Sequence, residues 1–189
     1  MPLVHASSRP LGLALCVLFG AYAATAATAA TVATAAAATA ATGAAIAKPL
    51  TDFTLPAVAG SNVRLSEYLG QPVVLSFWSS RCSLCAAQLK ALDRYYDTYR
   101  SSGLVVLGIS VEDDPQRALD YAHAHKTSFP MLLDRGKIVS RALDIDRLPT
   151  TVLIDRGGTV RYLHGDDNPS DPSYVAQIRA LLDDRLIAP

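Results

Sequence analysis

The sequence predicts an α/β fold in which one mixed central sheet is flanked by helices. Strand and helix patterns alternate between residues 73 and 126, which requires parallel strands joined by a crossover helix. The turn signal Arg-Gly-Gly at 156–158 separates two later strand patterns, which indicates an antiparallel hairpin. An amphipathic pattern closes the domain at 173–186. Parallel and antiparallel strands are therefore expected in one sheet.

The first half of the domain shows long, well-defined patterns. Residues 73–78 form a continuous apolar and β-branched run, typical of a strand buried on both faces. Helical spacing follows, and Gly103 is a suitable stop for that helix. Its predicted inward face is Leu89, Leu92, Tyr96 and Tyr99. Residues 104–110 predict a second buried strand, and Pro115 opens a second helix.

The second half has shorter elements. Residues 129–134 predict an extended piece and 138–145 a short helix. Strands are expected at 148–155 and 159–164, on either side of the Arg-Gly-Gly turn.

Composition excludes several classes of protein. The 189 residues carry 17 Lys+Arg and 17 Asp+Glu, and no basic stripe suggests nucleic acid. Only 3 cysteines are present, which excludes a disulfide-dense scaffold and an all-cysteine zinc site. No cofactor is expected apart from a redox-active disulfide.

The N-terminus has the pattern of a targeting segment rather than of a folded domain. Residues 1–24 combine Arg9, an apolar run containing Cys16 and small residues, which predicts a signal peptide or an uncleaved membrane anchor. Residues 25–47 are almost only alanine and threonine and predict a low-complexity linker. The folded domain is expected at 48–189, in a periplasmic or otherwise extracytoplasmic location.

The remaining cysteines lie three residues apart in "SFWSSRCSLC" at 76–85. Cys82 falls between the strand and the helix, where free N–H groups and the helix dipole stabilise a thiolate, and Arg81 adds positive charge. Cys85 follows one turn later on the same face, where it can bond to Cys82. The pattern indicates that Cys82 attacks a substrate disulfide and that Cys85 releases the product.

Two simpler interpretations of the pair remain open. A purely structural disulfide would close too short a loop to add much stability. A metal clip would need two further ligands, and the nearest donors, His123 and His125, would not share a helix face.

Three longer stretches resemble the thioredoxin superfamily, and within it the extracytoplasmic TlpA/ResA group of thiol-disulfide oxidoreductases. They are "FTLPAVAGSNVRLSEYLGQPVVLSFWSSRCSLC" at 53–85, "LGISVEDDP" at 107–115 and "LPTTVLIDRGGTV" at 148–160. The resemblance covers the chain from Phe53 onward and implies a thioredoxin-like fold with an N-terminal hairpin extension. It also implies a cis Leu148–Pro149 bond, with Trp78, Arg81, Leu148 and Pro149 in contact with substrate.

The chain departs from the family at three positions. Ser76 stands where thioredoxins have a buried aspartate, and Gln88 where the TlpA/ResA group often has a glutamate. Arg81 replaces a common tryptophan. With both usual carboxylates missing, Glu112 is the residue that we expect to take the proton of Cys85; the alternative is a solvated turn residue.

The resemblance implies a reductase of protein disulfides, supplied with electrons at the membrane and acting in cytochrome c or copper-centre assembly. Two other functions stay open. The first is a thiol peroxidase, since peroxiredoxins share this fold and carry a Pro-x-x-x-Thr-x-x-Cys segment. Ser79 could replace the threonine of that segment, but Leu75 occupies the position of its proline. A copper-binding module would use a longer cysteine spacing and a later histidine, for which His164 is the candidate.

Overall fold

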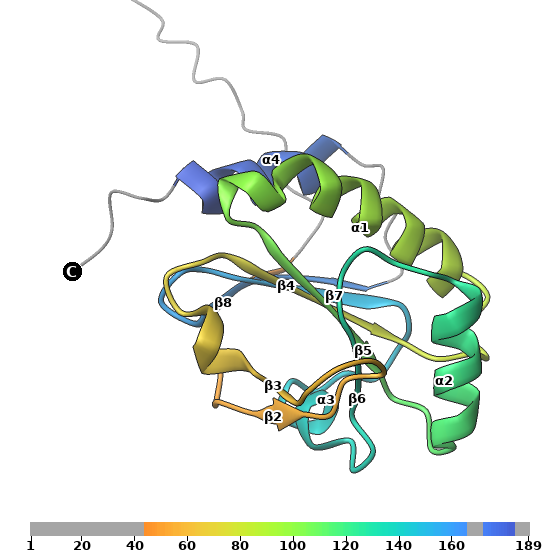
Figure 1. The fold of residues 1–189 in the computed structure, drawn as a ribbon. Coiled ribbons are helices and arrows are strands. Elements are labelled where there is room, and N and C mark those ends of the chain that lie inside the picture. The colour runs from red at the N-terminus through yellow and green to blue at the C-terminus, as the bar shows by residue number, and fades with distance from the viewer. Residues whose placement is uncertain (1–43, 166–171, 184–189) are drawn as a thin grey trace, which may run out of the picture. The chain divides into compact units, whose positions relative to one another are not determined.

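The computed structural model describes residues 44–165 and 172–183 of the chain, and the predicted segment at 1–24 lies outside them. A six-stranded sheet runs in the order β1-β8-β7-β4-β5-β6 (Figure 1). Its strands are β1 (Ala44–Pro49), β4 (Val73–Trp78), β5 (Val105–Ser110), β6 (Met131–Leu133), β7 (Thr150–Ile154) and β8 (Thr159–Gly165). The mixed sheet confirms the predicted fold class.

The parallel half of the sheet follows from the buried strand patterns. β4 pairs in parallel with β5, and β5 with β6, through the crossover helices α1 (Cys85–Tyr99) and α2 (Pro115–Ala124). Every residue of β4 and β5 is buried, because both faces of these strands are covered. A short 3-10 turn, η2 (Arg100–Ser102), ends α1 at Gly103, whose φ of 96° favours glycine.

The antiparallel half begins where β7 pairs with β4. The Asp155 carboxylate accepts hydrogen bonds from the N–H groups of Gly157 and Thr159 and so shapes the turn between β7 and β8. β1 then pairs with β8 along the edge of the sheet. This strand starts at Ala44, before the expected domain start at 48, so the end of the predicted linker belongs to the sheet.

Two hydrophobic clusters cover the two faces of the sheet. The first combines even-numbered β4 residues, such as Val74, with α1, α2 and α4 (Pro172–Asp183). The second combines odd-numbered β4 residues, such as Leu75, with α3 (Ile138–Ala142) and the N-terminal segments. Figure 1 shows α1 and α4 together on one side of the sheet. None of the helices in the described part of the chain is long and apolar enough to cross a membrane.

The predicted N-terminal hairpin is present as a separate two-stranded sheet of β2 (Thr54–Leu55) and β3 (Val63–Arg64). It leads into the 3-10 helix η1 (Leu65–Tyr68) just before β4. Between its strands, Val58 N–H donates to the Met131 carbonyl at 2.7 Å, which fastens the hairpin loop to β6.

Candidate active site

A disulfide joins Cys82 and Cys85, with an S–S distance of 2.09 Å. β4 ends at Trp78 and α1 begins at Cys85, so Cys82 lies in the connecting turn. The Cys82 N–H donates to the Ser79 carbonyl at 3.2 Å, and the Cys85 N–H donates to the Cys82 carbonyl at 3.3 Å. The pair therefore occupies the strand-to-helix junction that the sequence indicates.

The two cysteines differ in how far solvent reaches them. Cys82 is half-buried, whereas Cys85 is 0% exposed and packs within the first hydrophobic cluster. Leu84, between them, is 54% exposed, and Arg81 is exposed as well. Solvent therefore reaches Cys82, whereas Cys85 is closed off from it.

Glu112 lies beneath the cysteine turn. Its side chain is only 6% exposed, so it is not the solvated turn residue of the alternative interpretation. One carboxylate oxygen, Oε1, accepts hydrogen bonds from the backbone N–H of Ser80 at 2.6 Å and from the Ser80 hydroxyl at 2.5 Å. This carboxylate holds the turn two residues before Cys82.

The loop at Leu148–Pro149 comes to the same edge of the sheet. β4 and β7 are antiparallel with Phe77 opposite Thr150, so the start of β7 lies beside the end of β4. The Leu148–Pro149 bond is cis, as expected. Leu148 is half-buried and, like Cys82, packs against the first hydrophobic cluster, whereas the Pro149 side chain is buried.

Trp78, which the resemblance predicts to contact substrate, is closed to solvent in this structure. It ends a strand covered on both faces, and its side chain is 0% exposed. Its ring stacks on Tyr121 of α2 with centroids 4.9 Å apart, and Tyr121 in turn lies 4.1 Å from the ring of His125. Trp78 thus supports the cysteine turn from inside the domain.

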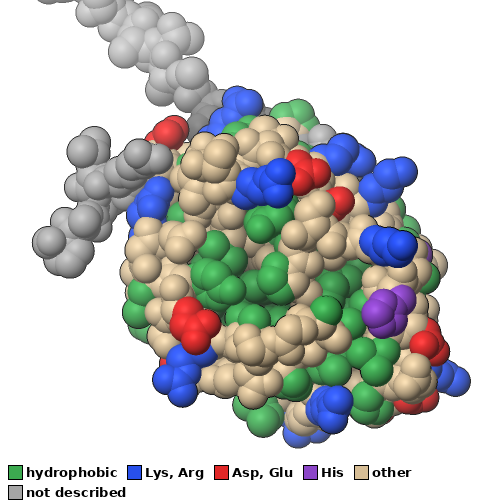
Figure 2. Space-filling view, in the orientation of Figure 1, with side chains coloured by type: hydrophobic (Ala, Val, Ile, Leu, Met, Phe, Trp, Pro, Cys, Tyr) green, Lys and Arg blue, Asp and Glu red, His purple; other side chains and the backbone are tan. Residues whose placement is uncertain are grey.

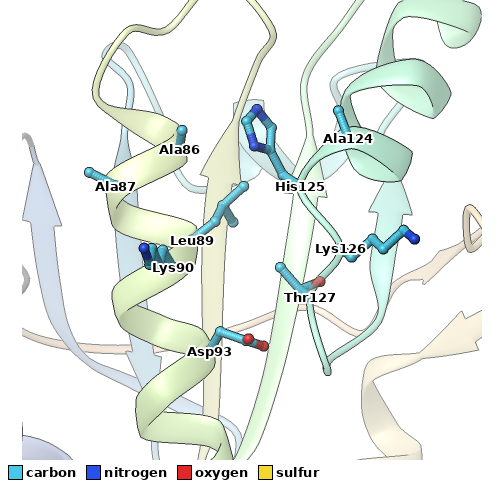
Figure 3. A pocket seen from close by; sticks show the side chains of 9 residues that line it. All are labelled: Ala86, Ala87, Leu89, Lys90, Asp93, Ala124, His125, Lys126 and Thr127. Atoms are coloured by element: carbon cyan, nitrogen blue, oxygen red, sulfur yellow. The ribbon is translucent and has the colours of Figure 1, made fainter.

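A cavity of about 540 Å³ opens between α1 and the end of α2 (Figure 3). It starts at Ala86, the residue after Cys85, and His125 lies across from Ala86 in this view. Its charged lining residues are Lys90, Asp93 and Lys126. No sequence pattern marks this hollow, because it depends on how two separate helices end.

A cluster of buried polar side chains lies behind the disulfide, on the side of α1 and α4. Gln88 of α1 donates from Nε2 to Thr151 Oγ1 at 2.7 Å and to the Tyr174 hydroxyl at 3.2 Å. His164 Nε2 lies 2.6 Å from Gln177 Oε1, and the His164 and Tyr174 rings are 4.3 Å apart. Sequence reasoning singled out Gln88 and His164 separately but missed the residues that connect them.

Comparison with known proteins places this geometry in a family. Residues 46–163 match the AhpC/TSA family. The chain belongs to the AhpC/TSA family. It is 31% identical to the thiol-disulfide oxidoreductase ResA of Geobacillus kaustophilus over 119 residues, which cover 63% of this chain and 68% of that protein. The Geobacillus thermodenitrificans ResA is also 31% identical, over 62% of this chain and 67% of the relative.

Solved structures give the same fold. A crystal structure from Chlorobium tepidum, named for the thiol:disulfide interchange protein DsbE, aligns with a TM-score of 0.69 at 27% identity. The match covers 72% of this chain and 96% of that one. With its Cys82–Cys85 disulfide, the AhpC/TSA chain is a thiol-disulfide oxidoreductase of the ResA and DsbE type.

Proposed function

We propose that this oxidoreductase reduces protein disulfides through a mixed disulfide at Cys82, which Cys85 resolves. The observation that carries the proposal is the difference in burial between the half-buried Cys82 and the fully buried Cys85. The Cys82 thiolate attacks a partner disulfide and releases one partner thiolate. Cys85 then gives up its proton and attacks Cys82, so that the Cys82–Cys85 bond forms and the second partner sulfur leaves reduced.

The surroundings of Cys82 favour this order of attack. Cys82 precedes the N-terminus of a 15-residue helix, where backbone N–H groups and the helix dipole stabilise a negative sulfur. The exposed guanidinium of Arg81 adds positive charge next to it. Inside the domain, Cys85 has no comparable access to a partner.

Substrate contacts are proposed at the loop beside the disulfide. We assign them to Arg81, to the backbone of Leu148 and to the wall formed by Pro149, with the exposed Leu84 as an apolar addition. Figure 2 shows hydrophobic side chains gathered in the middle of one face, with charged side chains mainly around them. Next to the disulfide, the exposed apolar side chain of Leu84 suits a protein partner better than a small polar one.

The proposed setting is extracytoplasmic. The N-terminal pattern, the linker and the resemblance to the TlpA/ResA group support a secreted or membrane-anchored reductase, supplied by a membrane electron donor. Cytochrome c or copper-centre assembly is the process that this group suggests. The equilibrium potential of the Cys82–Cys85 couple tests the direction: a value well above that of thioredoxin would assign an oxidase instead.

Trapping of partners tests the assignment of roles. Cys85→Ser removes the resolving sulfur, so mixed disulfides at Cys82 should persist and be isolated from cells of the source organism under non-reducing conditions. Cys82→Ser is the matched control and should trap nothing. Accumulation of partners on Cys82→Ser instead would reverse the two roles.

A thiol peroxidase is the second candidate, because residues 46–163 match the AhpC/TSA family. At the position of the peroxidase proline, the buried Leu75 leaves that motif incomplete. Hydrogen peroxide consumption by the reduced protein, measured beside reduction of a disulfide-bonded protein substrate, separates the two activities. For the copper alternative, stoichiometric Cu(I) binding that persists when disulfide exchange is lost would be the supporting result.

A further inference from the structure

The cavity between α1 and the end of α2 begins close to the disulfide. Its first lining residue, Ala86, directly follows Cys85, whose Cα lies 5.4 Å from that of Cys82. Consecutive Cα atoms are about 3.8 Å apart, so the cavity begins within about 9 Å of Cys82. A protein that forms a mixed disulfide at Cys82 therefore brings its own neighbouring residues within reach of the cavity.

The cavity extends along α1, away from the disulfide. Ala86, Lys90 and Asp93 lie at i, i+4 and i+7, so they share one face of this helix. With a rise of about 1.5 Å per residue, this face covers about 10 Å. An extended chain advances about 3.3 Å per residue, so about three residues of a partner fit along it. Figure 3 shows His125 and Thr127 on the opposite wall.

Small side chains leave this space between the helices open. Ala86 and Ala87 of α1 and Ala124 at the end of α2 all line the cavity. Ala87 and Ala124 are exposed, so the cavity opens to solvent on both helices. A segment of a partner can therefore enter it from outside.

Two lysines without ion-pair partners flank the cavity. Lys90 of α1 and Lys126 after α2 are exposed, and neither forms an ion pair with any residue of 44–165 or 172–183. Figure 3 shows them on opposite sides of the cavity, with the His125 ring lying between the two helices. The imidazole N–H of this histidine is a further donor that suits a carboxylate.

The acidic side chain in the cavity already has a partner. Asp93 is the single acidic residue among the described residues that line the cavity. Its Oδ1 accepts a hydrogen bond from the Ser128 N–H at 2.6 Å, which holds the turn after α2 against α1. Asp93 also lies at the end of the row farther from the disulfide. Positive charge therefore dominates the part of the cavity nearer to Cys82.

We propose that this cavity binds an acidic segment of the disulfide-bonded protein substrate. Carboxylates about three to five residues from the substrate cysteine lie at the right distance to pair with Lys90 and Lys126. This docking role rests on the proposed function and gives it a class of substrate. Exposed ion pairs are individually weak, so the cavity acts on the encounter and on the choice of partner, not on the exchange chemistry at Cys82.

The rate of reaction with charged peptides tests the proposal. The reduced full chain, with Cys16→Ser so that only Cys82 and Cys85 react, is mixed with peptides whose single cysteine carries a 2-pyridyl disulfide. The Cys82 thiolate attacks the cysteine sulfur of the peptide, and the pyridinethiolate leaves with the electron pair and is followed by its absorbance. The peptides carry Glu, Gln or Lys three to five residues on either side of the cysteine.

The parent protein should prefer the acidic peptide. At low salt, the Glu peptide should react about threefold to tenfold faster than the Gln peptide, as expected for two exposed ion pairs. The Lys peptide should react slowest. In 1 M salt the three rates should converge, because exposed charges are screened.

Paired variants locate the preference in the cavity. Lys90→Gln with Lys126→Gln should remove most of the advantage of the Glu peptide. The matched control is Lys48→Gln with Arg64→Gln, which removes two exposed positive charges that do not line the cavity, and it should keep the advantage. Charge reversal, Lys90→Glu with Lys126→Glu, should make the Lys peptide the fastest. The small neutral 2,2′-dipyridyl disulfide should react equally with all of these proteins, because it reports on Cys82 alone.

The remaining outcomes separate failure of docking from failure of the proposed function. A parent protein that attacks dipyridyl disulfide but treats the Glu and Gln peptides alike would overturn docking and leave the proposed function standing. Equal loss of preference in the cavity variant and its control would also overturn docking, since net charge would then explain the effect. A leucine-flanked peptide that reacts faster than the Glu peptide would assign the cavity to an apolar segment instead. A parent protein that does not attack even dipyridyl disulfide would overturn both proposals.

Discussion

A single carboxylate oxygen of Glu112 accepts two hydrogen bonds from Ser80, one from the backbone N–H at 2.6 Å and one from the hydroxyl at 2.5 Å. Glu112 comes from the segment after β5, whereas Ser80 belongs to the turn after β4. The bond therefore ties the ends of two neighbouring parallel strands together beneath Cys82. Because this oxygen already accepts two hydrogen bonds, Glu112 positions the turn. This positioning role competes with the proton-accepting role that the sequence predicts for Glu112.

Substitution of Glu112 separates these two roles. Glu112→Ala leaves both Ser80 donors unpaired and should lower the free energy of unfolding by about 1–3 kcal/mol, measured by urea denaturation. It should also slow attack by Cys82. Glu112→Gln keeps an acceptor oxygen and should restore most of both properties. A Gln variant that is stable but fails only in attack by Cys85 would instead support the proton-accepting role.

Asp134 is expected to contribute strongly to stability. It is 1% exposed and accepts hydrogen bonds from the N–H of Ile138 at 2.8 Å, the N–H of Ser140 at 2.9 Å and the Ser140 hydroxyl at 2.9 Å. Asp134→Ala would leave the first N–H groups of α3 without an acceptor and should lower the free energy of unfolding by about 3 kcal/mol. Asp134→Asn, which keeps one acceptor oxygen, should cost less. Equal unfolding midpoints for Asp134→Ala and the parent would refute this assignment.

Gly108 is required by close packing. A Cβ at this position would lie 2.3 Å from Met131 Sδ and 3.3 Å from Trp78 Nε1. Gly108→Ala should therefore destabilise the fold by about 1–3 kcal/mol through overpacking. Since Trp78 is the single tryptophan of the chain, its fluorescence should shift as well. Gly136→Ala, whose Cβ would lie 3.2 Å from Cγ1 of the exposed Ile138 side chain and far from the buried Trp78 contacts of Gly108, is the control and should leave the emission unchanged.

The elements that the sequence predicts well are those with a strong local signal. The apolar run at 73–78 is β4, and Pro115 is the first residue of α2, which the Asp114 side chain caps. The turn signal at 156–158 likewise separates β7 from β8. In each case, neighbouring residues alone determine the conformation.

Contacts between distant segments escape the same reasoning. Gln88 and Thr151 are 63 residues apart, and only the folded sheet brings them to 2.7 Å. The burial of Trp78 is also set by distant segments, because elements from other parts of the chain cover both faces of β4. The edge strand β1 was missed because an alanine-rich segment has no strand pattern until β8 is there to pair with it.

Low pH should weaken the surface ion pair between Asp113 and Lys137. Lys137 Nζ lies 2.7 Å from Asp113 Oδ1, and this hydrogen bond, with the positive charge of Lys137, lowers the pKa of Asp113 below its usual value of 3.8. Arg81 and Arg141 act in the same direction. A carboxyl group whose pKa is lowered by folding stabilises the folded state above its unfolded pKa, and this contribution is lost as the pH falls through the folded pKa.

Asp113→Asn should therefore melt at a lower temperature than the parent at pH 6, and the two curves should converge below the lowered pKa of Asp113. The difference should be small and should shrink in 1 M salt, because Asp113 is largely exposed and its ion pair is screened. Asp97→Asn, whose pair with Arg100 spans 3.9 Å, is the matched control and should change less. A gap between Asp113→Asn and the parent that persists at pH 2, or that ignores salt, would mean that the substitution acts through packing rather than through charge.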